Sequence, residues 1–466
     1  MIEIMKMSKF NFTTFDQDGN LILYNFLKGI SSLTKVMKPN VKKFSQIFLT
    51  DAKIFSSSCI NHAEVINSLY KSGILVADDI DESVLYDSVH YNYVHDNKLT
   101  LFILPTGECN FNCTYCFESK KPFFRGAMTL DAQDAILKFV QRQIPNHKAV
   151  HVYWFGGEPL LEHQVVKRLS DKFIKICNAR FLPYYAEIIT NGYLLDIEMF
   201  DMLYNSKVYN YMVTVDGFKE QHDKQRFTCN GIGTYDVILK NLSEIRNSKK
   251  YKFAHIRIRV NMTRRFLNIL DDFIYFIDSL FSDDPRFSFQ FEVVRDFSGS
   301  KSSKNDEQNI YDELTLRLQK NDVYMNKFYP EENKISLIDQ GRKCVAGLKN
   351  SYVITPDLNV YKCHVHYNMK ANNIGCISFK GDLLIDDTLH KRWYLINKYV
   401  QKIPDTCNDC FYLPACHYGS KVCPVRYLKP KQELVVCPME NEEHIKRVTA
   451  TILYAVNKHP CTTLTI

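Results

Sequence analysis

Short apolar runs alternate with amphipathic stretches through the middle third of this chain. Six runs have the length and the β-branched and aromatic content of strands: residues 98–104, 150–155, 186–190, 211–215, 255–262 and 287–294. Between them, apolar residues recur at helical spacing over residues 130–142, 165–177, 197–204, 235–245 and 266–281. Thr129 and Asp196 stand just before two of these stretches, where N-cap residues are expected.

This alternation predicts an α/β fold built on a parallel sheet. Six strand–helix units at this spacing favour a partial (β/α)6 barrel, with its chemistry at the carboxyl ends of the strands. A flat doubly wound sheet has the same periodicity, so the pattern alone leaves both arrangements open.

The residues before the barrel follow a different pattern. Residues 10–25 predict a β-hairpin with Asp18 and Gly19 at its turn, and residues 63–73 predict a helix that ends at Gly73. Residues 74–76 follow as a short strand. We therefore expect an N-terminal domain over residues 1–97, the barrel over 98–320, and a cysteine-rich region with a C-terminal helix over 321–466.

Composition narrows the function. The chain has 466 residues, 45% of them hydrophobic and 13% aromatic, which is ample for large cores. Its net charge of +7 is mild and includes no dense Lys/Arg block, so no nucleic-acid partner is expected. No signal-like or membrane-length apolar run is present, so we expect a cytoplasmic protein that does not enter a membrane. Fifteen cysteines in a reducing compartment indicate metal binding rather than disulfides.

Three of these cysteines form the most informative motif. Cys109, Cys113 and Cys116 have CxxxCxxC spacing directly after the first barrel strand. Three thiolates can hold three irons of a [4Fe–4S] cubane, which leaves the fourth iron open to a small molecule. Tyr115 adds a flat surface beside that iron. A zinc knuckle is the alternative, although zinc ligands usually come as CxxC doublets with a second pair.

This loop resembles the cluster loop of radical S-adenosylmethionine (SAM) enzymes, in which the open iron chelates the methionine end of SAM. The run Gly-Gly-Glu-Pro after the next strand looks like the element that binds the amino group of SAM. Thr-Asn-Gly and Val-Thr-Val-Asp-Gly at two further strand ends resemble elements that line the SAM and substrate pocket. The resemblance implies that SAM is contacted by Tyr115, Gly156, Gly157, Glu158, Thr190, Asn191, Asp216 and Arg226. For Asp216, His222 and Arg226, a structural role in loop capping is equally consistent with the sequence.

The C-terminal cysteines resemble the SPASM extension of radical SAM peptide-modifying enzymes, which houses two auxiliary [4Fe–4S] clusters. The resemblance implies that the outer cluster is held by Cys407, Cys410, Cys416 and Cys437, and the inner one by Cys344, Cys363 and Cys423. Two zinc ribbons are the alternative. Leu358 stands where the family's Pro-Asp-Gly turn has glycine, and six residues separate Cys416 from Cys423. Both departures weaken the register of Cys423.

The inner site has three matched ligands. The family's frequent extra cysteine is Asn350 here, and Cys376 follows Cys363 closely enough to be considered as a fourth ligand. If Cys376 does not bind, the open iron favours a thiolate from a substrate.

The resemblance implies a radical SAM oxidoreductase that matures a ribosomally made, Cys-containing precursor peptide. A 5′-deoxyadenosyl radical would remove a hydrogen from the peptide, and a Cys sulfur-to-carbon thioether would follow. The N-terminal domain resembles small winged-helix domains that bind a leader peptide by β-augmentation, although a plain packing domain fits nearly as well. An external donor such as flavodoxin or ferredoxin would supply electrons.

Three alternatives remain. An anaerobic sulfatase-maturating enzyme would carry a basic aspartate directly after the Cys of the Pro-Asp-Gly turn, where this chain has His364. Carbon–carbon crosslinking or epimerisation of a peptide needs the same radical. An electron carrier without SAM chemistry would not need the strand-end motifs.

Overall fold

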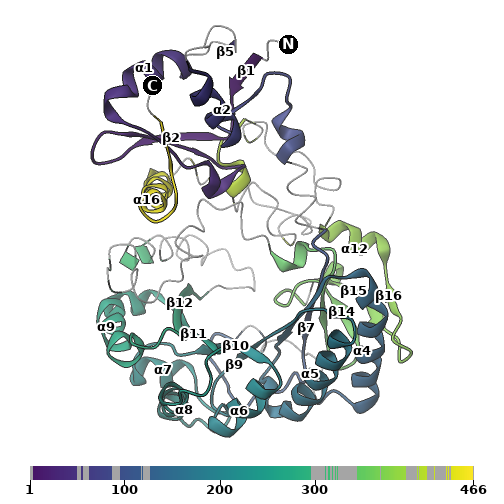
Figure 1. Cartoon of the computed structure of the whole chain (residues 1–466). Coiled ribbons are helices and arrows are strands. Elements are labelled where there is room, and N and C mark those ends of the chain that lie inside the picture. Colours follow the sequence, from purple (N-terminus) through teal and green to yellow (C-terminus); the bar gives the residue numbers. More distant parts are fainter. Residues whose placement is uncertain are drawn as a thin grey trace. The chain divides into compact units, whose positions relative to one another are not determined.

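The computed structural model describes two compact units of the chain (Figure 1). The barrel unit comprises His95–Pro330 and Leu348–Tyr394, and the terminal unit comprises Met1–Val94, Glu331–Gly347 and Leu395–Ile466. Described residues are 4–49, 54–55, 62–86, 95–116, 118, 126–294, 310, 313–314, 317–318, 321, 323, 344–367, 369–394, 407, 409–416, 425, 437, 439 and 442–464. The expected three-part domain division stays a prediction.

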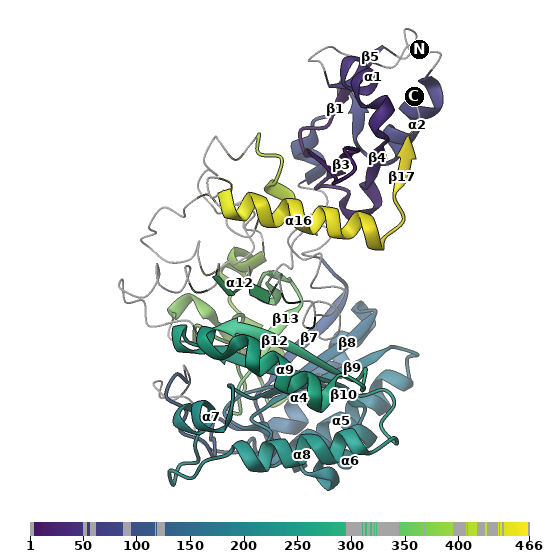
Figure 2. The same cartoon turned by 90° about the vertical axis from the view of Figure 1, so that its left-hand side faces the viewer.

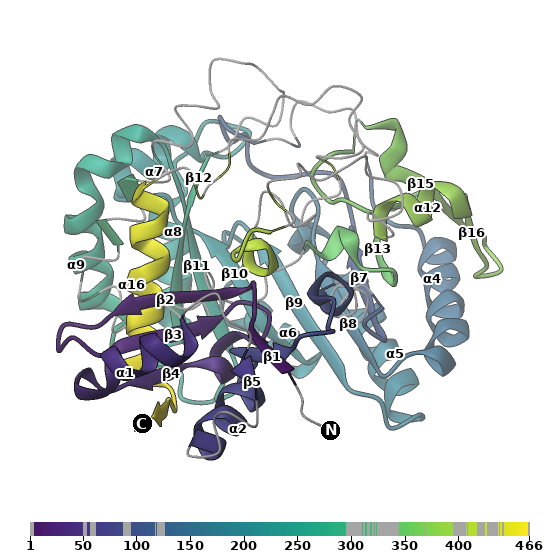
Figure 3. The same cartoon turned by 90° about the horizontal axis from the view of Figure 1, so that it is seen from above.

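Six parallel strands form the core of the barrel unit in chain order (Figure 3). They are β7 (Lys98–Ile103), β8 (Ala149–Trp154), β9 (Tyr184–Thr190), β10 (Val208–Thr214), β11 (His255–Met262) and β12 (Phe287–Val293). A doubly wound sheet would reverse its strand order at a switch point, and this order does not reverse. The predicted α/β partial barrel is therefore confirmed, and the flat alternative is excluded.

Helices follow the barrel strands and cover the outer face of the curved sheet (Figure 1). The caps predicted from sequence are present, because the side chain of Thr129 accepts the Ala132 N–H and that of Asp196 accepts the Met199 N–H. The stretch predicted as one helix over 266–281 is divided into a 3-10 turn (Arg264–Ile269) and α9. The helices are α4 (Leu130–Gln143), α5 (His163–Asn178), α6 (Ile197–Asn205), α7 (Lys219–Gln225), α8 (Tyr235–Asn247) and α9 (Leu270–Phe281).

A later segment of the chain extends the barrel sheet to ten strands. Strand β13 (Ser351–Ile354) pairs parallel with β7, which is the first barrel strand. Antiparallel strands β14 (Asn359–Tyr361), β15 (Asn373–Ile377) and β16 (Leu383–Ile385) then complete the edge. Helix α12 (Asp387–Tyr394) follows, and its Trp393 indole N–H donates to the Ala371 carbonyl at 2.8 Å.

The terminal unit contains a four-stranded sheet in the order β17-β4-β3-β2. The predicted hairpin is present as β2 (Asn11–Phe15) and β3 (Leu21–Asn25), with Gly19 at φ +80° in its turn. Strand β4 (Thr34–Val36) follows, and β17 (Thr462–Leu464) pairs parallel with it (Figure 2). A second sheet has the order β5-β1-β6, from β5 (Ile54–Phe55), β1 (Ile4–Met7) and β6 (Leu75–Ala77).

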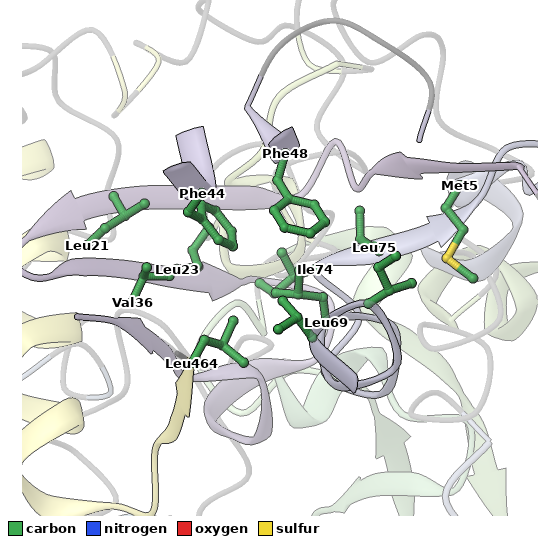
Figure 4. Close-up of a cluster of buried hydrophobic side chains, with 12 residues drawn as sticks. Met5, Leu21, Leu23, Val36, Phe44, Phe48, Leu69, Ile74, Leu75 and Leu464 are labelled. Atoms are coloured by element: carbon green, nitrogen blue, oxygen red, sulfur yellow. The ribbon is translucent and has the colours of Figure 1, made fainter. Parts of the chain in front are cut away.

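Both faces of β3 are covered, which explains why its first four residues are all apolar and buried. Leu21 and Leu23 contribute to one cluster, with side chains from α1 (Lys38–Phe48) and α2 (Ala63–Lys71) (Figure 4). Ile22 and Tyr24 alternate with them and contribute to a second cluster, with Val448 and other side chains of α16 (Glu442–Lys458). Segments from both ends of the chain thus share one core. No helix within the described ranges has the length and apolarity needed to cross a membrane.

Candidate active site

The CxxxCxxC loop leaves the carboxyl end of β7 and is held by backbone pairing with residues 225–229. The Asn112 N–H donates to the Phe227 carbonyl at 2.9 Å, and the Thr114 N–H donates to the Gln225 carbonyl at 3.0 Å. The Cys229 N–H closes the ladder by donating to the Asn110 carbonyl at 3.0 Å. The loop is therefore one side of a short antiparallel ribbon, and its conformation does not depend on metal alone.

The three cysteines of this loop are half-buried. Burial raises the pKa of Cys109 to about 12, and burial also raises the pKa of Cys113, against the opposing charge of Arg226. Such thiols stay protonated until a cation displaces the proton, as iron–sulfur ligation does. Three half-buried thiols on one braced loop fit three corners of a [4Fe–4S] cluster. Among all described residues, no three Cys, His, Asp or Glu side chains converge on a position for one metal ion.

Tyr115 is fixed by buried polar groups from the ends of three elements. Its hydroxyl donates to Asp216 Oδ2, and it accepts from Arg226 Nη1 at 2.7 Å and from Asn261 Nδ2 at 3.2 Å. The Asn261 backbone N–H also donates to Asp216 Oδ1 at 2.7 Å. Burial raises the pKa of Asp216, and the Arg226 guanidinium, 4.0 Å away, opposes this shift. Tyr115, which directly precedes Cys116, is thus anchored to the barrel strands.

His222, in the segment after β10, supports this network through the backbone of Asp216. His222 Nδ1 accepts the Asp216 backbone N–H at 3.1 Å, so its other nitrogen carries the proton and bonds Thr234 Oγ1 at 3.0 Å. Thr234 donates in turn to the Arg226 carbonyl at 3.0 Å. Burial lowers the pKa of His222 to about 3, so the ring is neutral at pH 7. Of the two roles left open by the sequence, the described contacts support loop positioning.

The Gly-Gly-Glu-Pro turn packs directly on the cluster loop. A Cβ on Gly157 would lie 2.1 Å from the Glu108 carbonyl oxygen, and Gly156 has φ +117°. Glu158 is fully buried, and its carboxylate accepts from Leu160 N, Thr190 Oγ1 and Asn191 N at 3.0, 2.7 and 2.7 Å. The glycines are thus required by the backbone of the loop itself, and Glu158 connects this turn to the end of β9.

Two asparagines of the site, Asn110 and Asn261, are not identified by any sequence motif. Asn110 Oδ1 accepts from Asn191 Nδ2 at 2.7 Å, and Asn191 Nδ2 lies 4.0 Å from Cys109 Sγ. Asn261 contacts both Tyr115 and Asp216. Asn261 lies at the end of a barrel strand, as Asn191 does. That shared position is the sequence feature from which Asn261 could have been identified as a site residue.

The predicted inner-cluster residues divide between the units. In the barrel unit, the Cys363 N–H donates to Asn372 Oδ1 at 2.7 Å, beside the start of β15. Cys376 pairs instead with Asn359, at the other end of the β14–β15 pair. Asn373 and Cys376 are separated by three strand residues, about 10 Å. The register therefore separates Cys376 from Cys363. Cys344 belongs to the terminal unit, and Cys423 lies outside the described residues.

The four predicted outer-cluster cysteines are all among the described residues, and contacts link Cys410 to two of the others. Cys407, Cys410 and Cys416 pack against the apolar clusters of the terminal unit. The Cys410 N–H donates to the Cys407 carbonyl at 3.2 Å. Burial raises the pKa of Cys410, and the neighbouring Cys437 adds to this effect. Four thiolates are a usual ligand set of a [4Fe–4S] cluster, and the assignment of these four to one cluster stays a prediction.

Residues 103–259 match the radical SAM superfamily. This part of the chain is a radical SAM domain. The chain is 24% identical over 347 residues to the cysteine-type anaerobic sulfatase-maturating enzyme of Clostridium perfringens strain 13, covering 70% of this chain and 89% of that protein. It is also 24% identical over 272 residues to the radical SAM cyclopropyl synthase TigE of Paramaledivibacter caminithermalis, covering 53% of this chain and 55% of that protein.

A solved structure supports the fold of this radical SAM domain. Native anSMEcpe with bound AdoMet and Cp18Cys peptide superposes with a TM-score of 0.62 at 21% identity, covering 77% of this chain and 99% of that chain. The chain thus contains a radical SAM domain over residues 103–259 and is similar to an anaerobic sulfatase-maturating enzyme over 70% of its length.

Proposed function

We propose that this radical SAM enzyme modifies a ribosomally made, Cys-containing precursor peptide by closing a thioether between the cysteine sulfur and a carbon of an acceptor residue. It would carry three [4Fe–4S] clusters, one that binds SAM and two auxiliary ones. The proposal is supported by the braced CxxxCxxC loop and by the proximity of Cys410 to Cys407 and Cys437. The Cp18Cys peptide bound by the solved relative anSMEcpe suggests the same substrate class.

The chain's own residues position and shield the reactants. Cys109, Cys113 and Cys116 would hold the first cluster, and the hydrogen bonds of Tyr115 and Asn191 fix the loop beside the strand ends. Bound SAM and the reduced cluster would supply a 5′-deoxyadenosyl radical, which is the part of the chemistry that belongs to the cofactors.

The proposal of a thioether depends mainly on the separation of Cys376 from Cys363. If Cys376 does not reach the inner cluster, the matched ligands there number three, and an open iron favours a substrate thiolate. Asn350 stands at the position of the family's extra cysteine, and its side chain supplies no thiolate but donates from Nδ2 to the Asp96 carbonyl at 3.4 Å. In the closure, the peptide would lose one hydrogen atom from carbon and one proton from sulfur, and an auxiliary cluster would supply the acceptor for the remaining electron.

Formylglycine formation on a sulfatase is the second candidate, because the relative from Clostridium perfringens is named as a sulfatase-maturating enzyme. That reaction needs a base where this chain has His364. Burial against Phe102 and Phe155 lowers the pKa of His364 to about 4, which makes it a weak base at neutral pH.

Mass spectrometry of the product separates the candidates. The protein is incubated anaerobically with SAM, dithionite and a Cys-containing precursor, and 5′-deoxyadenosine is quantified in parallel. A thioether product is two hydrogens lighter than the substrate and resists thiol alkylation. A carbon–carbon crosslink is also two hydrogens lighter than the substrate, but its thiol can still be alkylated. Formylglycine loses the sulfur, and epimerisation leaves the mass unchanged. The Cys376→Ser variant should keep its iron and form the same product, and loss of both would refute an open inner site.

A further inference from the structure

Strand β17 covers the β4 edge of the four-stranded sheet in the terminal unit. Its three residues pair parallel with Thr34–Val36, and the Thr462 N–H donates to the Leu33 carbonyl at 2.9 Å. Antiparallel β2 and β3, in contrast, share five register pairs. The β4 edge is thus occupied by the chain's own short strand.

One side chain anchors β17. Leu464 is 5% exposed and enters the apolar cluster that also contains Val36, Phe44 and Leu69 (Figure 4). Thr462 and Thr463 are exposed. Because the ladder uses backbone groups alone, any extended segment with an apolar residue at the Leu464 position can make the same contacts.

The β2 edge offers no comparable anchor. Its burial alternates between half-buried and exposed, with Phe15 57% exposed, and none of its residues belongs to the cluster around Leu464. Phe12 is engaged by Phe26 and Phe411 on the opposite side of the sheet. A docking segment therefore gains a buried apolar contact at the β4 edge and not at the β2 edge.

The charges on helix α1 indicate which flanking residues a docking peptide should have. Helix α1 begins just after β4, contributes Phe44 and Phe48 to the cluster, and contains no acidic residue. It exposes Lys38, Lys42 and Lys43 to solvent. Acidic side chains that flank the apolar anchor would be attracted to this helix.

We propose that the β4 edge is a docking site for an extended, acidic peptide segment with one apolar anchor, and that β17 is an internal competitor that the peptide must displace. This inference rests on the proposed function, which supplies a precursor peptide with a leader. A site that is open only part of the time binds with an affinity lowered by its open fraction. Strand β17 would thus exclude peptides that lack the anchor and the acidic flank.

The test compares two full-length variants that add the same charge to β17. Leu464→Asp removes the buried anchor, whereas Thr463→Asp places the charge on an exposed neighbour. Peptides are selected on Leu464→Asp from a display library of random sequences, and their affinities for all three proteins are measured by fluorescence anisotropy. Hydrogen exchange of Thr34–Val36 with and without peptide locates the bound segment.

We expect the selected peptides to be acidic with an apolar anchor, to protect Thr34–Val36, and to bind Leu464→Asp about ten-fold more tightly than the unchanged protein or Thr463→Asp. Equal affinity for all three proteins, protection of Asn11–Phe15 instead, or no enrichment would overturn the proposal. If Leu464→Asp misfolds, Leu464→Ser replaces it. The measurement uses neither SAM nor reductant, so a failure of 5′-deoxyadenosine formation would refute the proposed function and leave this result standing.

Discussion

In the barrel unit each strand from β7 to β12 pairs with its neighbour in the chain, whereas in the terminal unit β4 pairs with β17 from the far end of the chain. Sequential strands need only local crossovers, which explains why the barrel follows directly from the hydrophobic pattern. The terminal sheet depends on a partner that no local pattern identifies. The two units should therefore differ in how far along the chain the loss of stability from a single substitution extends.

The largest effect is expected at the cluster loop of the barrel unit. Replacing Cys109, Cys113 and Cys116 together by Ala should abolish SAM cleavage, because no thiolate then holds the first cluster. Iron bound by the C-terminal cysteines should remain, since those ligands are unchanged. Chromatographic assay of 5′-deoxyadenosine and iron analysis check this, and retained 5′-deoxyadenosine formation would show that the loop is not the SAM-binding site.

In the terminal unit, a substitution near one end of the chain should loosen the other end. Ile452 on α16 is buried in the cluster with Ile22 and Tyr24, and Ile452→Ala should cost about 2–5 kcal/mol of unfolding free energy in this unit. Hydrogen exchange should accelerate at Leu21–Asn25 and stay unchanged in β7–β12. The exposed Lys446→Ala serves as the control. Unchanged exchange in β3 would contradict the shared core.

A smaller effect is expected where the Gly-Gly-Glu-Pro turn meets the cluster loop. Gly157→Ala places a Cβ 2.1 Å from the Glu108 carbonyl oxygen and must displace the loop. SAM cleavage should fall on the order of 100-fold, as misplaced reacting groups typically cause. Gly231→Ala is the control for destabilisation without a clash, because its Cβ meets nothing within 4 Å and only its backbone, at φ +78°, is strained. Equal losses in both variants would point to general destabilisation.

The barrel unit should lose stability in mild acid. Burial lowers the pKa of His222 to about 3 and that of His390 to about 4. The unfolded chain binds these protons near pH 6.5, so between pH 6.5 and 4 the unfolded state binds more protons, and stability falls as pH falls. Each ring contributes at most about 1.4 kcal/mol per pH unit. Urea unfolding at pH 7 and pH 5 measures the slope, which should flatten in His390→Gln. An unchanged slope would exclude His390 as a source.

The smallest effect concerns Leu358, a buried residue at φ +67°. Leucine pays a steric cost in this left-handed region that glycine does not pay. Leu358→Gly and Leu358→Ala both lose buried apolar surface, but only Gly removes the steric strain of the left-handed backbone. We expect Gly to be more stable than Ala by about 1 kcal/mol in thermal unfolding. The reverse order would show that the turn is not strained.

The sequence pattern predicted the features that depend on interactions between residues close together in the chain. The barrel strands, the caps at Thr129 and Asp196, and the hairpin around Gly19 are all set by residues close in the chain. The pairing of β13 with β7 and of β17 with β4 depends on long-range contacts, which periodicity does not encode. At the site, the cysteine spacing identified the loop, but its supports Asn110 and Asn261 carry no spacing signature. Leu358 was recognised only as a missing glycine, and its left-handed backbone shows that the turn is kept despite the cost.

The pairing of β17 with β4 also affects how the chain is made. Roughly 430 residues separate the two strands, and at about 5–20 residues per second their synthesis takes on the order of 20–90 s. During that time β3 has been made but lacks the cover of α16 over Ile22 and Tyr24. The nascent N-terminal segment therefore presents an apolar strand to chaperones and to other nascent chains. Expression at low temperature or with extra chaperone should raise the yield of this protein, because both limit aggregation while β3 is uncovered.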